Sequence, residues 1–345
     1  MYLFCYGTRP EIIKMFPLIK CFKRHGIEFK TYFTNQDTDM FDDFKYMIPE
    51  PDFVGDDFDK SKSLNTLTGK IVQQLDKILK SNIISYVIVQ GDTTSAMAAA
   101  LASFNSRKKI IHLEAGLRTY NRWSPYPEEV NRCLISKLAD IHLCPTLVAV
   151  DNLKREGIID NVYQVGNTVV DAFKIIKNSS PTPTAIEDII KQGDYFLVTL
   201  HRRENRVKIK TMWEQLNKLS QSYKFVYILH PSLMEAVTYL SSRIMILNHL
   251  DYVSMVHLIL GTKGIITDSG GIQEESVCCG KRVLICRNTT ERPECVDSGW
   301  GKLVGSDITS NMMFLTHMGN TKSSNPYGNN VSKKIVEIIK TSKYN

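Results

Sequence analysis

The fold class of this chain is decided by residues 86–114, which read YVIVQGDTTSAMAAALASFNSRKKIIHLE. Two short runs rich in Val and Ile, residues 86–90 and 108–114, flank an Ala-rich stretch that is long enough for a helix of several turns. A strand, a helix and a second strand in this order form a βαβ unit, whose two strands lie parallel in one sheet. The stretch therefore predicts an α/β fold with a parallel sheet.

The same alternation extends through the first half of the chain and then begins again. It restarts at DYFLVTL, residues 194–200, beyond a Ser/Pro/Thr-rich stretch at residues 178–184. We therefore expect two doubly wound, Rossmann-like domains, in residues 1–168 and 169–330. A C-terminal helix is expected in residues 331–345, and whether it packs back onto the first domain stays open.

Composition excludes several classes of protein. The chain has 345 residues and a formal net charge of +7, but its Lys and Arg are not gathered with aromatics, so we expect no nucleic-acid partner, whereas an anionic small substrate fits. No apolar run approaches the ~20 residues of a membrane helix. The eight cysteines form no CxxC pair, and the histidines form no HExxH motif. We therefore expect a soluble, cytoplasmic protein with reduced thiols and no bound metal.

Charged side chains follow several predicted strands, where open α/β sheets bind ligands. Residues 7–14 read GTRPEIIK and place Arg9 and Lys14 at a turn and the start of a helix, a position that suits an anion. An ordinary turn with two solvated cations explains the same residues equally well. Asp92 and Glu114 each follow a strand of the βαβ unit, so the two carboxylates can converge. Asp92 can also simply cap the next helix.

Further candidates stand at later junctions. Glu128 and Arg132 lie about one turn apart near the start of a predicted helix, where a solvated ion pair is the alternative. His201 follows a strand and can titrate near neutral pH. The segment that contains Ser269, Gly270, Gly271 and Glu275 is predicted to begin a helix at a Gly-rich turn. Such a turn suits a nucleotide phosphate, and a carboxylate one turn later suits ribose. The dinucleotide, Walker A and GxSxG motifs are missing, so we expect no nicotinamide cofactor.

Eight segments of the chain are similar to motifs of one enzyme family, in the same order and at the same separations. They read GTRPEIIK, GDTTS, HLEAGLRT, PEEVNR, GNTVVDA, HRREN, TDSGGIQEE and TTERPE, and they span nearly the whole chain. On these residues the chain resembles the non-hydrolysing UDP-N-acetylglucosamine 2-epimerases of bacteria. The resemblance implies the GT-B fold, with two Rossmann-like domains facing across the cleft that holds the active site. It also implies a UDP-sugar substrate and no redox cofactor, and we expect a homodimer.

The family's reaction, as the resemblance implies it, inverts carbon 2 of the sugar and turns UDP-GlcNAc into UDP-ManNAc. UDP is eliminated to leave a 2-acetamidoglucal and is then added back. Cleavage of the anomeric bond builds positive charge beside carbon 2, so a positioned carboxylate can remove its proton, and inversion requires a second acid on the other face.

The resemblance also implies roles for the candidate residues. The acid/base set is Asp92, Glu114 and Glu128, and the face that each serves stays open. The groups that stabilise the departing UDP are Arg9, Lys14, Arg132 and the catalytic His201. The groups that bind its phosphates and ribose are Ser269, Gly270, Gly271 and Glu275.

One segment departs from the bacterial pattern. Many members carry His after the Gln that follows the second strand, whereas this chain reads TNQDTDMF, with Asp37 after Gln36. The pattern is closer to the TGQNYD of relatives that act on 6-deoxy-L sugars. Because this segment belongs to the UDP-GlcNAc effector site of bacterial members, we expect Gln36 to contact an effector or the sugar. Both a 6-deoxy-L substrate and the loss of activation by UDP-GlcNAc stay open.

Two other enzymatic functions compete with this interpretation. A GT-B glycosyltransferase would share the Gly-rich turn and Glu275 but would not need Asp92, Glu114 and Glu128. A hydrolysing 2-epimerase, which releases free N-acetylmannosamine, shares the first half of the chemistry. A non-catalytic sugar-nucleotide sensor is disfavoured because every expected acid, base and phosphate ligand is present.

Overall fold

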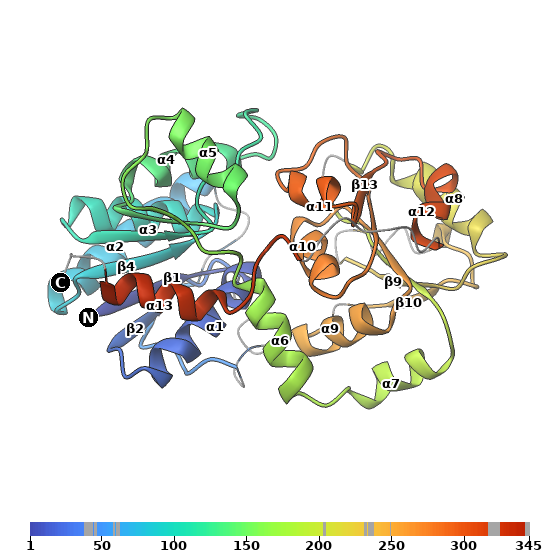
Figure 1. Cartoon of the computed structure of the whole chain (residues 1–345), viewed down its shortest axis with the longest axis horizontal. Helices are drawn as coiled ribbons and strands as arrows, with labels where there is room; N and C mark the ends of the chain where they lie inside the picture. Colours follow the sequence, from blue (N-terminus) through green and yellow to red (C-terminus); the bar gives the residue numbers. More distant parts are fainter. Residues whose placement is uncertain are drawn as a thin grey trace. The chain divides into compact units, whose positions relative to one another are not determined.

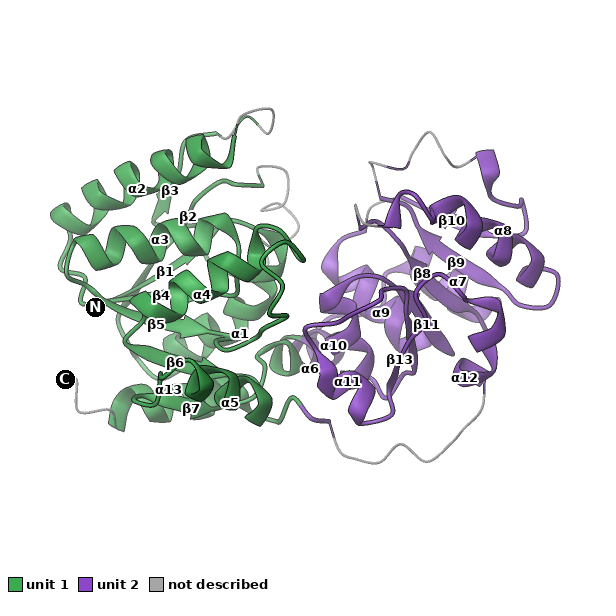
Figure 2. Cartoon of the chain, turned by 90° about the horizontal axis from the view of Figure 1, so that it is seen from above, with its two compact units in different colours: residues 1–172, 327–345 green, residues 173–326 purple. Residues whose placement is uncertain are grey.

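Two parallel sheets organise the described part of the chain, one in each of two structural units (Figure 2). Unit 1 holds residues 1–172 and 327–345, and unit 2 holds residues 173–326. The structure is a computed structural model that describes every residue except 38–43, 45–46, 58, 60–62, 203–204, 231–232, 234–237, 249, 317–324 and 342–345. Parts of the predicted motifs TNQDTDMF and HRREN therefore lie outside the described residues. The division between the two units falls at Ala172, inside helix α6 (Val169–Ser179) and close to the predicted boundary at residue 168.

The sheet of unit 1 has the strand order β3-β2-β1-β4-β5-β6-β7, and the strands pair in parallel. The order reverses between β1 and β4, so the carboxyl ends of these two strands form the topological switch point at which doubly wound sheets bind ligands. The strands are β1 (Tyr2–Tyr6), β2 (Phe29–Phe33), β3 (Phe53–Val54), β4 (Tyr86–Gln90), β5 (Lys109–Leu113), β6 (Ile141–Cys144) and β7 (Val162–Gln164).

Helices cover both faces of this sheet, with α2, α3 and α4 on one face and α1 and α13 on the other (Figure 1). Helix α3 is Ala-rich, and its small buried side chains allow close packing against α2 and the central strands. The core there also contains Leu75, which is fully buried and contributes about 1.5–3 kcal/mol. The helices are α1 (Arg9–Arg24), α2 (Leu64–Ser81), α3 (Thr94–Asn105), α4 (Glu128–Leu138), α5 (Leu147–Arg155) and α13 (Val331–Thr341).

Helix α13 returns to unit 1 at the end of the described chain. It packs against α1, and the two helices lie side by side in Figure 1. Asp171 accepts hydrogen bonds from the backbone N–H groups of Val331 at 3.3 Å and Ser332 at 2.7 Å. A carboxylate at a helix N-terminus satisfies free N–H groups and complements the helix dipole, so Asp171 anchors the start of α13.

The sheet of unit 2 has the order β10-β9-β8-β11-β12-β13, also parallel, with its switch point between β8 and β11. Its strands are β8 (Phe196–Thr199), β9 (Phe225–Ile228), β10 (Met245–Leu247), β11 (Gly264–Thr267), β12 (Val283–Ile285) and β13 (Gly301–Leu303). Its helices are α7 (Thr184–Lys191), α8 (Ile209–Leu219), α9 (Tyr252–Gly261), α10 (Gly270–Cys278), α11 (Pro293–Asp297), the 3₁₀ turn η5 (Thr309–Asn311) and α12 (Met312–Thr316). The two doubly wound parallel sheets confirm the predicted fold class.

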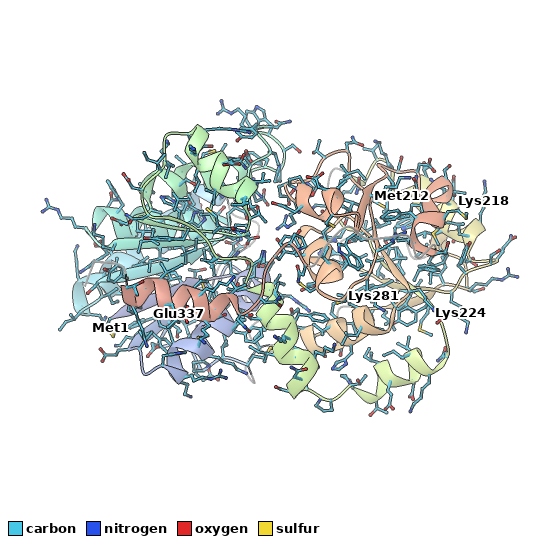
Figure 3. All side chains as sticks on the ribbon, viewed as in Figure 1. Met1, Met212, Lys218, Lys224, Lys281 and Glu337 are labelled. Atoms are coloured by element: carbon cyan, nitrogen blue, oxygen red, sulfur yellow. The ribbon has the colours of Figure 1, made fainter. Side chains whose placement is uncertain are left out.

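Helix α8 illustrates how unit 2 is packed. Met212, Trp213 and Leu216 recur at helical spacing and are buried in the core, whereas Lys218 is exposed. Figure 3 labels Met212 and Lys218 on the inner and outer sides of this helix. In the part of the chain that the structure describes, no helix is long and apolar enough to cross a membrane.

Candidate active site

Glu11 ties together the two loops at the switch point of unit 1. It lies in the first turn of α1, is fully buried, and accepts four hydrogen bonds. The donors are Gly7 N at 3.0 Å and Thr8 N, Thr8 Oγ1 and Thr93 Oγ1, each at 2.8 Å. Burial raises the pKa of Glu11 to about 7, although the hydrogen bonds act in the opposite direction. The loops after β1 and β4 are thus held by one carboxylate.

Glu114 stands directly after β5 in a strained backbone conformation. Its φ of +67° lies in the left-handed region, which costs a residue other than glycine about 1–3 kcal/mol. The donors to its buried carboxylate include Lys14 Nζ at 2.6 Å, Asn167 Nδ2 at 3.4 Å and Gln90 Nε2. A Cβ added to Gly91 would lie 3.7 Å from Glu114 Oε2, so this carboxylate lies beside the turn after β4. A buried charge needs such partners, and here they fix its position.

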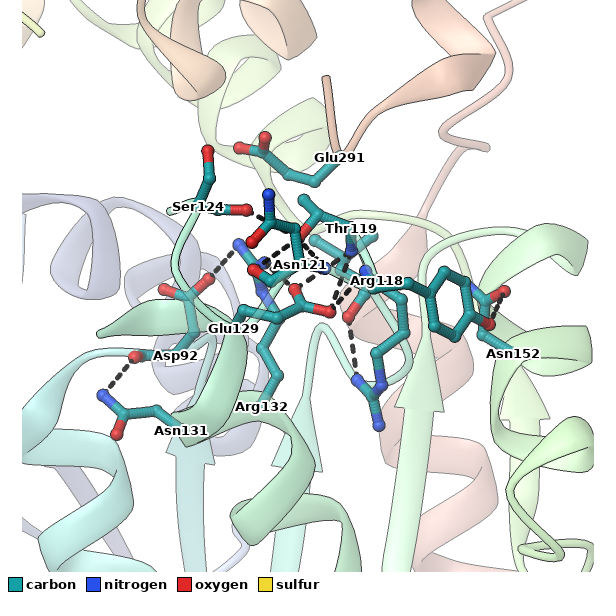
Figure 4. A network of polar contacts seen from close by, with 12 residues as sticks. Asp92, Arg118, Thr119, Asn121, Ser124, Glu129, Asn131, Arg132, Asn152 and Glu291 are labelled. Atoms are coloured by element: carbon teal, nitrogen blue, oxygen red, sulfur yellow. Dashed lines mark hydrogen bonds and ion pairs between the residues drawn. The ribbon is translucent and has the colours of Figure 1, made fainter. Parts of the chain in front are cut away.

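Asp92 follows Gly91 in that turn and is held by helix α4 (Figure 4). Arg132 Nη2 lies 2.5 Å from Asp92 Oδ2, and its Nη1 lies 2.8 Å from Glu129 Oε2. Asn131 Nδ2 donates to the backbone oxygen of Asp92 at 2.9 Å. Arg132, expected to face the departing UDP, is therefore shared by two carboxylates of unit 1. Glu128 is half-buried and begins the same helix, about one turn before Arg132.

Arg9 and Gln36 flank this switch point. The guanidinium of Arg9, at the start of α1, lies over the ring of Phe44 at 5.9 Å from its centroid. Gln36 Oε1 accepts hydrogen bonds from Ser95 N at 3.2 Å and Ser95 Oγ at 2.7 Å, at the N-terminus of α3. The amide of Gln36 is thus docked onto the helix that follows Asp92.

In unit 2, His201 stands at the end of β8, against the end of β11. Asp268 is fully buried and accepts hydrogen bonds from the backbone N–H groups of His201 and Arg202 and from Asn205 Nδ2. His201 Nδ1 lies 3.3 Å from Asp268 Oδ1, and the ring stacks on His230. Burial lowers the pKa of His201, although the charge of Asp268 opposes this. The imidazole is thereby oriented and favoured in its neutral form.

The Gly-rich turn of unit 2 leads directly into α10. Ser269 is the N-cap, and the helix begins at Gly270, where an added Cβ would lie 2.5 Å from Arg292 Nη1. At Gly271 an added Cβ would meet no atom within 4 Å. Because the space beside Gly271 is open, the free backbone N–H groups at the N-terminus of α10 suit a phosphate. Glu275 is buried further along the same helix.

The predicted residues thus lie near two switch points, one in each unit. Those of unit 1 are Arg9, Lys14, Gln36, Asp92, Glu114, Glu128 and Arg132, and those of unit 2 are His201, Ser269, Gly270, Gly271 and Glu275. Several buried carboxylates, among them Glu11, Glu129 and Asp268, have no role in the predicted site. The capping-box spacing from Thr8 marks Glu11, but no pattern separates the other two from neighbouring acids. Among the described residues, no group of three or more His, Cys, Asp or Glu could hold a metal ion.

Comparisons with known proteins agree on one family. A family model described as UDP-N-acetylglucosamine 2-epimerase matches residues 20–340. A protein of this name from Salmonella borreze is 38% identical, over 98% of this chain and 97% of its own length. The crystal structure of the Neisseria meningitidis UDP-GlcNAc 2-epimerase bound to UDP-GlcNAc is similar, with a TM-score of 0.91, 35% identity and coverage of 98% and 99%. The enzyme from Methanocaldococcus jannaschii, in complex with UDP-GlcNAc and UDP, gives a TM-score of 0.86, 30% identity and 99% coverage of both chains.

Proposed function

The chain belongs to the UDP-N-acetylglucosamine 2-epimerase family and is an isomerase, and we propose that it inverts carbon 2 of a UDP-N-acetylhexosamine by eliminating UDP and adding it back. One observation carries the proposal. Two carboxylates at neighbouring strand ends of unit 1 are each fixed by a cation, Glu114 by Lys14 and Asp92 by Arg132. Groups held in this way can exchange a proton with little rearrangement.

In the elimination, a carboxylate of unit 1 takes the proton from carbon 2 while the bond between carbon 1 and the phosphate oxygen breaks. UDP leaves with the electrons of that bond, and the electrons of the broken C–H bond form a double bond between carbons 1 and 2. The product is a 2-acetamidoglucal. Re-addition protonates carbon 2 on the other face as UDP returns to carbon 1. The acid/base set of this proposal is Asp92, Glu114 and Glu128.

UDP itself is assigned to unit 2 and to the cation that begins α1. The N-terminus of α10 and the neutral imidazole of His201 can donate hydrogen bonds to the pyrophosphate, and Glu275 can accept them from ribose. Arg9 adds positive charge. Lys14 and Arg132 are already paired with carboxylates, so they stabilise the negative charge of the departing UDP mainly through their electrostatic field and not by direct hydrogen bonds.

Hydrogen exchange at carbon 2 tests this proposal directly. The protein, dialysed against a chelator, is incubated with UDP-GlcNAc in deuterated water, and carbon 2 is followed by NMR. We expect deuterium at carbon 2 and formation of UDP-ManNAc without added NAD or metal. A strict need for either cofactor would overturn the proposal. Release of free N-acetylmannosamine would identify a hydrolysing enzyme, and sugar transfer without exchange would identify a glycosyltransferase.

Two finer features belong to the same proposal. Asp37 follows Gln36 where many bacterial members carry His, and this difference favours a 6-deoxy-L UDP-sugar and activity without added UDP-GlcNAc as effector; Gln36 itself is docked on Ser95. We also propose that the chain works as a homodimer in the cytoplasm. Phe104 on α3 and Leu134 on α4 are 56% and 47% exposed on helices that contact each other, and light scattering measures the mass of the assembly.

A further inference from the structure

Glu129 is a buried carboxylate that links three segments of unit 1 (Figure 4). Its Oε1 accepts hydrogen bonds from the backbone N–H groups of Thr119 at 3.0 Å and Tyr120 at 2.8 Å. Its Oε2 accepts from Arg132 Nη1 at 2.8 Å. The other terminal nitrogen of Arg132 contacts Asp92. One side chain therefore connects the segment that follows Glu114, the helix that begins at Glu128, and the turn that carries Asp92.

These contacts require a carboxylate at position 129. Every described hydrogen-bond partner of Glu129 is a donor, so both of its oxygens must accept. Tyr120 has a φ of +58°, in the left-handed region, so the turn there is strained. The hydrogen bonds that the backbone N–H groups of Thr119 and Tyr120 donate to Glu129 support this turn. A glutamine has one acceptor oxygen, so its amide would face either the backbone N–H groups or Arg132, donor against donor.

We propose that Glu129 is a positioning residue, which orients Arg132 and through it sets the place of the Asp92 carboxylate at the proton-transfer site. The inference rests on the proposed function, in which Asp92 exchanges the proton at carbon 2. Arg132 is buried between two carboxylates, so removing one of them frees the guanidinium to turn toward the other. A shift of about 1 Å in a reacting group costs on the order of 100-fold in rate.

The test compares Glu129→Gln with Glu156→Gln. Glu156 is a matched control, because it forms an ion pair with Arg118 at 2.6 Å in the same unit but has no described contact with Arg132 or Asp92. For Glu129→Gln we expect kcat for epimerisation to fall about 10- to 100-fold while UDP binding changes less than about 2-fold. For Glu156→Gln we expect a lower melting temperature and a kcat within about 2-fold of wild type.

A double-mutant cycle with Asp92→Asn separates positioning from general loss of structure. If Glu129 acts through Asp92, adding Glu129→Gln to Asp92→Asn changes the residual rate less than about 3-fold. Multiplying effects, or a normal kcat in Glu129→Gln, would overturn the inference and leave the proposed function standing. Normal turnover in Asp92→Asn would instead remove Asp92 from the proposed chemistry. If Glu129→Gln does not fold, Glu129→Asp gives the same readouts, because its shorter carboxylate reaches the backbone N–H groups or Arg132 but not both.

Discussion

Substituting Glu11 by Gln should stabilise unit 1 at pH 8 and leave its stability nearly unchanged at pH 4. Burial raises the pKa of Glu11 in the folded protein from 4.5 to about 7. Between these values the folded state holds one proton more than the unfolded state, so the stability of the wild type falls as pH rises through this interval. At about 1.4 kcal/mol per pH unit, the interval from 4.5 to about 7 corresponds to ~3 kcal/mol.

A glutamine avoids this loss because it carries no charge at any pH. At pH 4 the protonated Glu11 and the glutamine are similar in shape and charge, so the two proteins should have similar stability. At pH 8 the variant should be more stable by up to ~3 kcal/mol, a value that already includes the opposing effect of the hydrogen bonds from Gly7 and Thr8 on the pKa of Glu11. The difference between the two proteins should therefore grow with pH.

Urea unfolding at pH 4, 6 and 8 measures this difference. Because the chain has two units, unfolding should be followed by pulsed hydrogen exchange in peptides from β1 and β4, which report unit 1 alone. Glu156→Gln serves as a control, because its effect on stability should depend on pH with the opposite sign. Arg118 lowers the pKa of Glu156, so the wild-type carboxylate stabilises the protein above the unfolded pKa, and that contribution is lost in acid. A Glu11→Gln difference that stays constant within ~0.5 kcal/mol from pH 4 to 8 would refute the buried-charge argument.

Three further predictions follow from the proposed reaction. Asp92→Asn, Glu114→Gln and Glu128→Gln should each lower kcat at least ~100-fold while UDP affinity, measured by calorimetry, stays nearly unchanged; near-normal turnover in all three would make these carboxylates structural caps. Glu275→Gln should weaken UDP binding by ~1–3 kcal/mol with a smaller effect on the bound chemical step, which single-turnover kinetics can separate from binding. A 6-deoxy-L UDP-N-acetylhexosamine should give the higher kcat/KM without added UDP-GlcNAc; sigmoidal kinetics and a clear preference for UDP-GlcNAc would contradict this.

The sequence predicted the strands that carry the site because their signal is local. Residues 86–114 alternate between β-rich and Ala-rich stretches, and the structure places β4, α3 and β5 there. Parallel strands end at one edge of the sheet, so the sequence predicts that Asp92 and Glu114 lie near each other; in the structure the Glu114 carboxylate lies beside Gly91, the residue before Asp92. Strands as short as β3 and β13, of two and three residues, carry no periodicity to detect.

The pairings within the site depend on tertiary structure and could not be predicted in the same way. Lys14 and Glu114 are separated by 100 residues, and their contact requires α1 to lie over the end of β5. The left-handed conformation of Glu114 has no sequence signal either, because it occurs at a residue type that rarely adopts it. For Arg132 the resemblance implies a contact with UDP, whereas no local pattern predicts the ion pairs of its guanidinium with Asp92 and Glu129.

Burial, more than distance, distinguishes the ion pairs of the site from those of the surface. Lys14 and Glu114 lie 2.6 Å apart with side chains 6% exposed, whereas Lys80 and Asp76 lie 2.7 Å apart with side chains 73% and 41% exposed. The exposed pair is screened by water and contributes little. In the buried pair each charge would be costly without the other, so neither side chain can turn away to solvent. In the proposed reaction, a carboxylate confined in this way would need little reorganisation before it exchanges a proton with carbon 2.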